Sequence, residues 1–216
     1  MKNVLFLSRT IPTIEPWDHI LTAIDASIRV LPYSEDLDFE SIDTVLAWNP
    51  PEGIFPKLPN LKLIQSLGMG VDHLFKCGDL PHNIPIARLV DEDMFYQMAD
   101  YALYGTLKAL RNIQRHNVDQ RSARWGEYPR RFHKELTVGI LGLGNLGLAV
   151  AERLIENHFS VISWSRSRKE HPNIISYYGD AQLTSFLNRS DILICLLPLT
   201  TATADLLNYQ RLMQLP

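Results

Sequence analysis

The sequence predicts an α/β protein with two parallel-sheet domains of the Rossmann-like or flavodoxin-like kind. Short apolar runs alternate with helical or turn segments over the first ninety residues, and a second such series begins at residue 136. Several runs are apolar without a period of two, as is typical of strands covered on both faces. Strands that alternate with helices favour a parallel sheet.

The expected strands of the first series are residues 4–8, 28–31, 44–48, 61–67 and 84–89. Those of the second series are residues 136–141, 160–165, 174–178 and 191–197. We expect one domain over residues 1–93 and another over residues 94–216, with the boundary near residues 90–100.

One long helix is predicted from Met94 to Val118, because only Gly105 interrupts that stretch. Its apolar residues form two stripes, which implies burial against more than its own domain. A thick core helix and a dimer-forming helix both remain open. Residues 111–135 follow with seven Lys or Arg against three acids and include Trp125. We expect a solvated connector there, with a binding patch as the alternative.

The composition restricts the class of protein and its partners. The chain has 216 residues, of which 46% are hydrophobic and 21% charged, and this balance excludes a disordered or fibrous protein. Its net charge of −3 argues against nucleic-acid binding. No signal-peptide core or membrane-spanning run is present in the sequence, so we expect a cytoplasmic protein without a membrane partner. Cys77 and Cys195 lack metal-ligand spacing, and no metal site is predicted. We expect two reduced thiols, with Cys195 buried inside "ILICLLP".

A glycine motif follows the strand expected at residues 136–141. "GILGLGNLGLAV" places Gly142, Gly144 and Gly147 in G-x-G-x-x-G spacing between a strand and a helical segment. Gly142 permits the tight turn, Gly144 lets a pyrophosphate approach the backbone, and Gly147 allows close packing of helix on strand. Asn145 and Leu146 complete the expected phosphate site, which benefits from the positive end of the helix dipole.

The next strand ends in "SWSRSRK", where an NAD-selective site usually has an acidic residue. This turn instead offers Ser165, Arg166, Ser167 and Arg168. Guanidinium groups bind phosphate through charge-assisted hydrogen bonds, whereas a carboxylate would repel it. NADP(H) is therefore the predicted cofactor, with NAD(H) as the second possibility. The alternative is that the arginines only decorate a surface loop.

Several further motifs carry a family resemblance. Together with "LTVGILGLGNLG" and "LICLLPLTTATADLLN", the stretches "AWNPP", "SLGMGVDHL" and "MADYALYGTLKALR" make the chain resemble the D-2-hydroxyacid dehydrogenase family, and within it the glyoxylate/hydroxypyruvate reductase branch. The resemblance runs essentially from end to end. It implies that residues 1–93 form a substrate domain and residues 94–216 the first half of an NAD(P)-binding domain. It also implies a homodimer formed through the helix at about 95–118.

The same resemblance assigns residues to the substrate and the cofactor. Met69 and Gly70 would hold the substrate carboxylate through their N–H groups, and two glycines in "GMG" suit an anion-binding nest. Trp48 would restrict the pocket to small substrates, although a core aromatic is an equal alternative. The remaining cofactor contacts would be Met94 near the nicotinamide, Leu197 and Pro198 along the cofactor, and Thr203 near its phosphates.

The family's catalytic arginine, glutamate and histidine are expected beyond Pro216, so no catalytic residue is assigned. The resemblance makes His73 structural, and the other six histidines are expected at the surface or at caps. We expect the strand at 191–197 to pair with that at 136–141 and to leave an open outer edge, which a further strand of the family's domain would cover. We therefore hypothesise that the chain is a truncated, cleaved or disrupted form of a protein of about 300 residues.

These inferences converge on NADPH-dependent reduction of small 2-keto acids, namely glyoxylate to glycolate and hydroxypyruvate to D-glycerate. The alternative is a non-catalytic NADP(H)-binding sensor or scaffold with the same fold. The 216-residue form is expected to be inactive.

Overall fold

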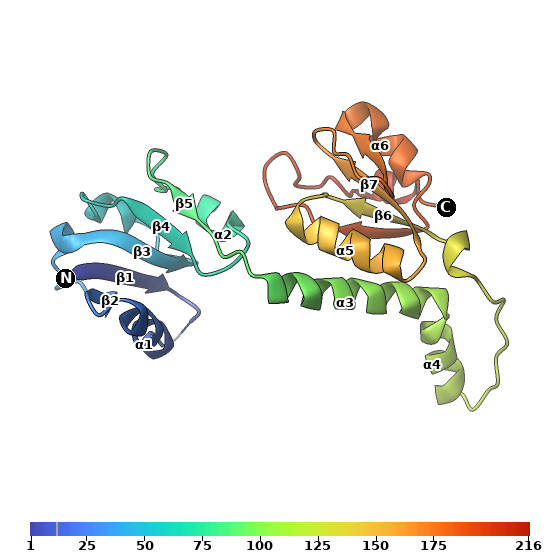
Figure 1. Cartoon of the computed structure of the whole chain (residues 1–216), viewed down its shortest axis with the longest axis horizontal. Helices are drawn as coiled ribbons and strands as arrows, with labels where there is room; N and C mark the ends of the chain where they lie inside the picture. Colours follow the sequence, from blue (N-terminus) through green and yellow to red (C-terminus); the bar gives the residue numbers. More distant parts are fainter. Residues whose placement is uncertain (12) are drawn as a thin grey trace. The chain divides into compact units, whose positions relative to one another are not determined.

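The computed structural model describes residues 1–11 and 13–216, which divide into two compact units, Met1–Asp91 and Glu92–Pro216 (Figure 1). Each unit contains one parallel sheet, so the predicted α/β class with two parallel sheets is confirmed. The assignment of the first unit to substrate and the second to cofactor stays a prediction.

The sheet of the first unit has five parallel strands. They are β1 (Lys2–Ser8), β2 (Ile28–Pro32), β3 (Ile42–Trp48), β4 (Leu63–Ser66) and β5 (Ile86–Ala87). Their order in the sheet is β2-β1-β3-β4-β5. This 2-1-3-4-5 order is that of the flavodoxin-like doubly wound sheet.

Alternate residues of these strands are buried on opposite faces, since successive side chains of a strand point to opposite sides. Val4 and Phe6 pack with Trp17 of helix α1 (Glu15–Ile24). Leu5 and Leu7 belong to a second cluster with Leu74 of α2 (Asp72–Phe75) and the short 3₁₀ turns around Phe55. A further 3₁₀ turn spans Phe39–Ser41. Both faces are thus covered, which explains the uninterrupted apolar runs.

The second unit contains a four-stranded parallel sheet and the helices around it. Its strands are β6 (Thr137–Leu141), β7 (Ser160–Ser165), β8 (Ile175–Tyr178) and β9 (Ile192–Cys195), in the order β8-β7-β6-β9. Its helical elements are α3 (Glu92–Leu110), α4 (Ile113–Arg121), the 3₁₀ turn His133–Glu135, α5 (Asn145–Glu156), α6 (Gly179–Leu187) and α7 (Tyr209–Leu212). The predicted pairing of β6 with β9 is confirmed, with Val138 opposite Ile192. This is the order of the first four strands of a Rossmann sheet, whose full order is 3-2-1-4-5-6.

Helices cover both faces of this sheet (Figure 1). Val138 and Ile140 of β6 pack into a cluster with residues of α3 and α5, among them Ala99 and Leu154. Leu141, the next residue along β6, instead packs with α6 through another cluster. The carboxyl ends of β6, β7 and β9 therefore emerge between two helical layers, where the doubly wound fold places its ligands.

The prediction of one helix from Met94 to Val118 is wrong. α3 ends at Leu110 and α4 begins at Ile113, and Asn112 between them has a left-handed backbone with φ 52°. Asparagine adopts this conformation more readily than most residues, so it can end a helix without a glycine or proline.

The prediction that Cys195 is buried is also wrong. β9 is the outermost strand of its sheet, and Cys195 at its end is exposed. The open outer edge of this strand was predicted, but the apolar run did not show that Cys195 itself would be exposed. Among the described residues, no helix is long and apolar enough to cross a membrane.

Candidate functional site

The turn after β6 is shaped by two glycines that lie against each other. Gly142 has φ +99°, and its N–H donates to the Trp164 carbonyl at 2.8 Å. A Cβ added at Gly147 would lie 1.9 Å from the Gly142 carbonyl oxygen. Only glycine therefore lets α5 come this close to the end of β6.

Gly144 has a different environment, because a Cβ added there would meet nothing within 4 Å. It is the N-cap of α5, and Asn145 and Leu146 form the first helical turn. The first N–H groups of an α-helix lack intrahelical partners and carry the positive end of its dipole. Gly144 thus leaves open space in front of an N-terminus suited to a phosphate group, which agrees with the predicted cofactor site.

The turn after β7 contains the serines and arginines predicted to select NADP(H). Ser165 is only 8% exposed, and its Oγ accepts a hydrogen bond from the Leu143 N–H at 3.2 Å. Arg166, Ser167 and Arg168 are exposed. Ser165 therefore ties this turn to the glycine turn, while the two guanidinium groups remain on the surface beside it.

Arg168 has an acidic neighbour. Its Nη2 lies 3.0 Å from Glu170 Oε1, and both side chains are mostly exposed. An ion pair this exposed stabilises the fold by less than about 1 kcal/mol. A bound phosphate can therefore compete for the Arg168 guanidinium.

The loop after β9 carries the remaining predicted cofactor residues of the sheet edge. Leu197 lies against the glycine turn, since a Cβ on Gly142 would be 3.1 Å from Leu197 Cδ2. Thr203 Oγ1 donates to the Pro198 carbonyl and accepts from the Thr200 N–H at 2.8 Å. These bonds close the loop on itself. Ser165 joins the loop after β7 to the loop after β6, and Leu197 packs the loop after β9 against the same glycine turn, so the three loops form one connected edge.

Met94, the last predicted cofactor contact, lies on another element of this unit. It is in the first turn of α3, and its side chain is 39% exposed.

In the first unit, the loop after β4 carries Met69 and Gly70. The indole of Trp48, at the end of β3, packs on this loop, and a Cβ on Gly68 would lie 2.4 Å from Trp48 Cζ3. Arg88 Nη1 donates to the Met69 carbonyl at 3.2 Å. Trp48 is half-buried and also contacts the His73 ring, with ring centroids 4.4 Å apart and the planes tilted by 50°. It therefore packs within the fold as a core aromatic, and its role in restricting the substrate pocket stays a prediction.

His73 is buried and forms hydrogen bonds through both ring nitrogens. The Asn49 N–H donates to Nδ1 at 3.3 Å, so Nδ1 carries no proton. Nε2 therefore carries the proton and donates to Ser66 Oγ at 3.1 Å. Burial lowers the pKa of His73, against the opposing effects of Asp72 and the Gly70 backbone. The structural role predicted for His73 agrees with this neutral, fully bonded ring.

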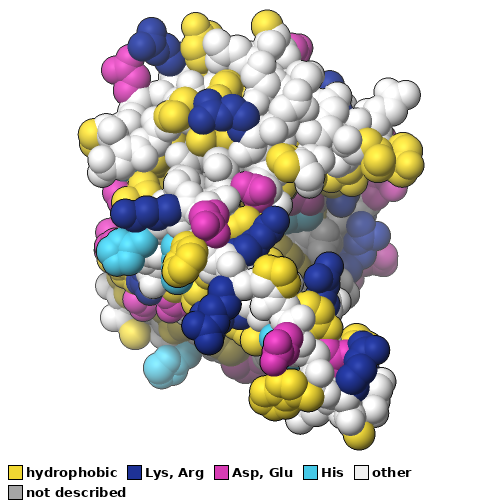
Figure 2. Space-filling model, turned by 90° about the vertical axis from the view of Figure 1, so that its right-hand side faces the viewer, with side chains coloured by type: hydrophobic (Ala, Val, Ile, Leu, Met, Phe, Trp, Pro, Cys, Tyr) yellow, Lys and Arg dark blue, Asp and Glu magenta, His cyan; other side chains and the backbone are white. Residues whose placement is uncertain are grey.

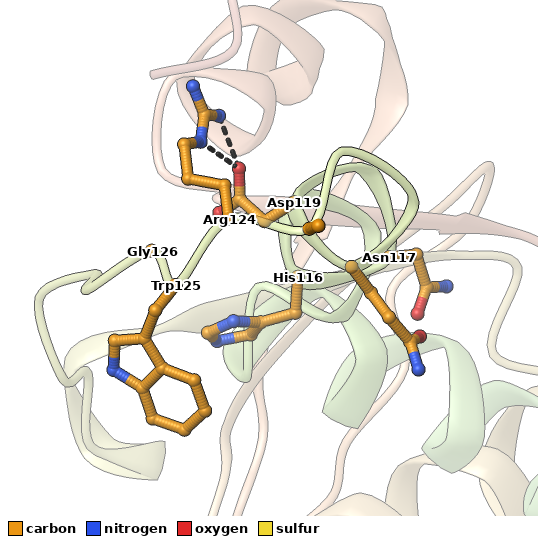
Figure 3. Close-up of a pocket in the computed structure, with 8 residues that line it drawn as sticks. His116, Asn117, Asp119, Arg124, Trp125 and Gly126 are labelled. Atoms are coloured by element: carbon orange, nitrogen blue, oxygen red, sulfur yellow. Dashed lines mark hydrogen bonds and ion pairs between the residues drawn. The ribbon is translucent and has the colours of Figure 1, made fainter.

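The connector after α4 forms an open surface pocket of about 520 Å³ (Figure 3). Figure 3 shows the Trp125 and His116 rings on one side, with the Arg124 guanidinium turned away toward Asp119. Asp119 is 2% exposed and accepts hydrogen bonds from Arg124 and from the Tyr128 hydroxyl at 2.6 Å. These bonds lower the pKa of Asp119 and hold the turn together.

Basic side chains do not merge into one patch on the face that includes this region, as Figure 2 shows. Hydrophobic side chains lie between them on this face. Trp125 of the connector is 92% exposed. Within residues 1–11 and 13–216, no group of three or more His, Cys, Asp or Glu side chains is arranged to hold a metal ion.

Comparisons with known proteins identify the family. Residues 103–216 match the NAD binding domain of the D-isomer specific 2-hydroxyacid dehydrogenases. A dehydrogenase of that description from Xanthobacter autotrophicus, solved with NADPH and MES, is 36% identical with a TM-score of 0.91, over 100% of this chain and 69% of that one. The chain belongs to the D-isomer specific 2-hydroxyacid dehydrogenase family.

Two further relatives of this chain carry more specific names. The glyoxylate/hydroxypyruvate reductase A of Photorhabdus laumondii is 37% identical over 183 residues, which are 82% of this chain and 58% of that protein. The NADPH-dependent glyoxylate/hydroxypyruvate reductase of Sinorhizobium meliloti, solved with NADP and sulfate, is 29% identical with a TM-score of 0.88, over 100% of this chain and 68% of that one. The chain thus spans less than two thirds of the length of the curated relative.

The sequence does not indicate the roles of two polar groups of this chain. Ser66 belongs to no motif in "QSLGMG", and its bonds to His73 and to the loop depend on the fold. Asp119 lies among the charges of the predicted solvated connector, although it is buried between Arg124 and Tyr128.

Gly147→Ala is expected to lower the stability of the second unit by about 3 kcal/mol, because the new methyl group must displace the Gly142 carbonyl or the whole of α5. Gly144→Ala provides the matched control, since its methyl group enters open space and should change stability by less than about 1 kcal/mol. Urea unfolding of the two variants measures the difference. Equal midpoints would contradict the close contact.

Acid should destabilise the first unit through His73. Its pKa is lowered in the fold, so both states hold the ring neutral above pH 6.5, and the unfolded state gains protons first as pH falls below 6.5. The free energy of unfolding therefore decreases as the pH falls from 6.5 toward the pKa that His73 has in the folded state. His73→Gln should remove this part of the pH dependence, whereas His82→Gln, at an exposed position, should retain it. Urea midpoints at pH 7.5 and 5.0 test this, and parallel curves for wild type and His73→Gln would refute it.

Proposed function

We propose that this chain carries the NADP(H) and substrate-binding parts of a reductase that converts small 2-keto acids to 2-hydroxy acids. Glyoxylate and hydroxypyruvate are the proposed substrates, with glycolate and D-glycerate as products. The names of the Photorhabdus and Sinorhizobium relatives support this substrate class. Activity of the 216-residue form is a separate question that the assay below addresses.

The observation that carries the proposal is the turn Ser165–Arg168. Ser165 bonds to Leu143 of the glycine turn, and the exposed Arg166 and Arg168 follow directly after this residue that joins the two turns. A dinucleotide whose diphosphate lies at that N-terminus would extend its adenosine ribose toward the end of β7. Guanidinium groups there favour a 2′-phosphate. The Xanthobacter and Sinorhizobium structures, solved with NADPH and NADP, support the same choice.

The loop after β4 is the proposed carboxylate site. Met69 and Gly70 would donate their N–H groups to the substrate, and Trp48 would restrict the substrate to a short chain. Bound NADPH would supply the hydride for the keto carbon. The acid that protonates the resulting alkoxide is not assigned in this chain.

A second candidate is an NADP(H)-binding sensor or scaffold without turnover. It is compatible with the state of His73, the histidine that follows the proposed carboxylate loop and is structural in both candidates. Both of its ring nitrogens are engaged and the ring is neutral, so it is not available as the acid of a reduction.

A homodimer in the cytoplasm is part of the proposal. The helix on which the dimer was predicted ends at Leu110, so α3 rather than residues 95–118 becomes the proposed contact. Tyr96, Tyr101 and Tyr104 are exposed on α3 and could be covered by a second copy.

Turnover separates the two candidates. NADPH absorbance at fixed protein concentration should fall on addition of glyoxylate or hydroxypyruvate if the chain is a reductase. Oxidation excludes the sensor, whereas binding of NADPH without oxidation is also what the expected inactivity of the 216-residue form predicts. Failure to bind NADPH at all contradicts both.

Replacing both Arg166 and Arg168 with alanine should weaken NADPH binding roughly hundredfold, because two charge-assisted hydrogen bonds to the 2′-phosphate are lost. NADH affinity should change less than about threefold, since NADH lacks that phosphate. Calorimetric titration with both nucleotides measures the ratio.

Two controls sharpen this test. Glu170→Gln removes the acidic neighbour of Arg168 and should leave NADPH binding unchanged or tighter. Arg29→Ala removes an exposed arginine of β2 in the other unit and should alter neither nucleotide. Equal losses of NADPH and NADH in the double variant would remove the assignment of the phosphate to this turn.

A further inference from the structure

The loop proposed to hold the substrate carboxylate is supported by one buried hydroxyl. Ser66, at the end of β4, is fully buried, and its Oγ makes three hydrogen bonds. It donates to the Gly70 carbonyl at 3.1 Å, and it accepts from the Gly68 N–H at 3.2 Å and from His73 Nε2 at 3.1 Å. Ser66 Oγ therefore connects Gly68 and Gly70, the two ends of the turn, to His73 in α2.

The directions of these bonds are determined along a chain of donors. The Asn49 N–H can only donate, so His73 accepts at Nδ1 and donates at Nε2. Ser66 Oγ receives that proton and the Gly68 N–H, so its own hydrogen is directed to the Gly70 carbonyl. The other tautomer, with the proton on Nδ1, would place two donors against each other at Asn49. The network thus has one arrangement of hydrogens.

The orientation of the Gly70 carbonyl bears on the proposed site. Each peptide unit is planar, so the hydrogen bond to the Gly70 carbonyl fixes the peptide plane that follows Gly70, and the bond from the Gly68 N–H fixes the plane before Gly68. The N–H groups of Met69 and Gly70 lie between these two planes. Trp48 restricts the same turn sterically, because its ring leaves no room for a side chain at Gly68.

We propose that Ser66 and His73 are positioning residues that aim the Met69 and Gly70 N–H groups at the substrate carboxylate. The inference rests on the proposed function, because it assumes that this turn binds the carboxylate. Neither side chain need touch the substrate. Ser66 acts through the turn, and His73 acts through Ser66.

The test uses the full chain saturated with NADPH, glyoxylate as probe, and amide NMR signals as readout. In wild type, glyoxylate should shift the Met69 and Gly70 signals. Ser66→Ala should shift these two signals before any addition and should weaken glyoxylate binding about tenfold, while NADPH affinity stays unchanged.

Ser190→Ala is the matched control for buried serine removal. Ser190 is fully buried in the second unit and donates to the Phe186 carbonyl at 2.8 Å, so its loss also removes a buried hydrogen bond. Glyoxylate binding should remain at the wild-type value in this variant. A loss equal to that of Ser66→Ala would reduce the role of Ser66 to general stability and overturn the inference.

A pair of variants at His73 covers the case in which Ser66→Ala does not fold. His73→Gln keeps an N–H donor for Ser66 and should retain glyoxylate binding, whereas His73→Ala removes the donor and should weaken it about tenfold. Equal affinities in these two variants would contradict the positioning role.

The positioning role of Ser66 and the carboxylate site can be disproved separately. If glyoxylate binds in wild type and binds equally in Ser66→Ala, the positioning role is wrong and the carboxylate site stands. If glyoxylate leaves the Met69 and Gly70 signals of the wild type unchanged, the proposed carboxylate site is wrong and the inference falls with it.

Discussion

The contact between Gly147 and the Gly142 carbonyl is the constraint on which the second unit depends. It brings the first turn of α5 against the end of β6 at a distance that excludes any side chain. The N–H groups of that turn then point along the carboxyl edge of the sheet, beside the turn that Ser165 connects to Leu143. Two backbone segments and one buried hydroxyl thereby define a site suited to phosphate, and no charged residue is needed to orient the helix.

The first unit orients the backbone N–H groups of its proposed ligand loop by different interactions. Its proposed ligand loop follows a parallel strand, as the glycine turn does, but a short α2 of four residues cannot offer a comparable helix dipole. Here the backbone is oriented by Ser66 and His73, and Trp48 fills the space above Gly68. Both units thus hold backbone N–H groups at the carboxyl edge of a parallel sheet, one by close packing and the other by a buried hydrogen-bond network.

The sequence predicted the strands and the pairing of β6 with β9 well, because buried parallel strands leave continuous apolar runs such as "VLFLS" and the glycine motif identifies the strand that precedes it. It did not predict the end of α3 at Leu110, since the left-handed backbone of Asn112 has no required residue type. The open edge of β9 was predicted, but the apolar run "ILICLLP" did not show that Cys195 would be exposed at that edge. The inward bond of Ser165 joins residues 22 positions apart, and the bond from Asn49 to His73 spans 24 positions. Such contacts follow from topology and not from any local pattern.

A crystal structure of the chain with NADPH is the most direct test of the central claim. The account predicts diphosphate oxygens within about 3 Å of backbone nitrogens in the first turn of α5, at residues 144–146, with the Gly142–Gly147 contact unchanged. A diphosphate bound away from that turn, or an α5 that must move off β6 to admit it, would contradict the account.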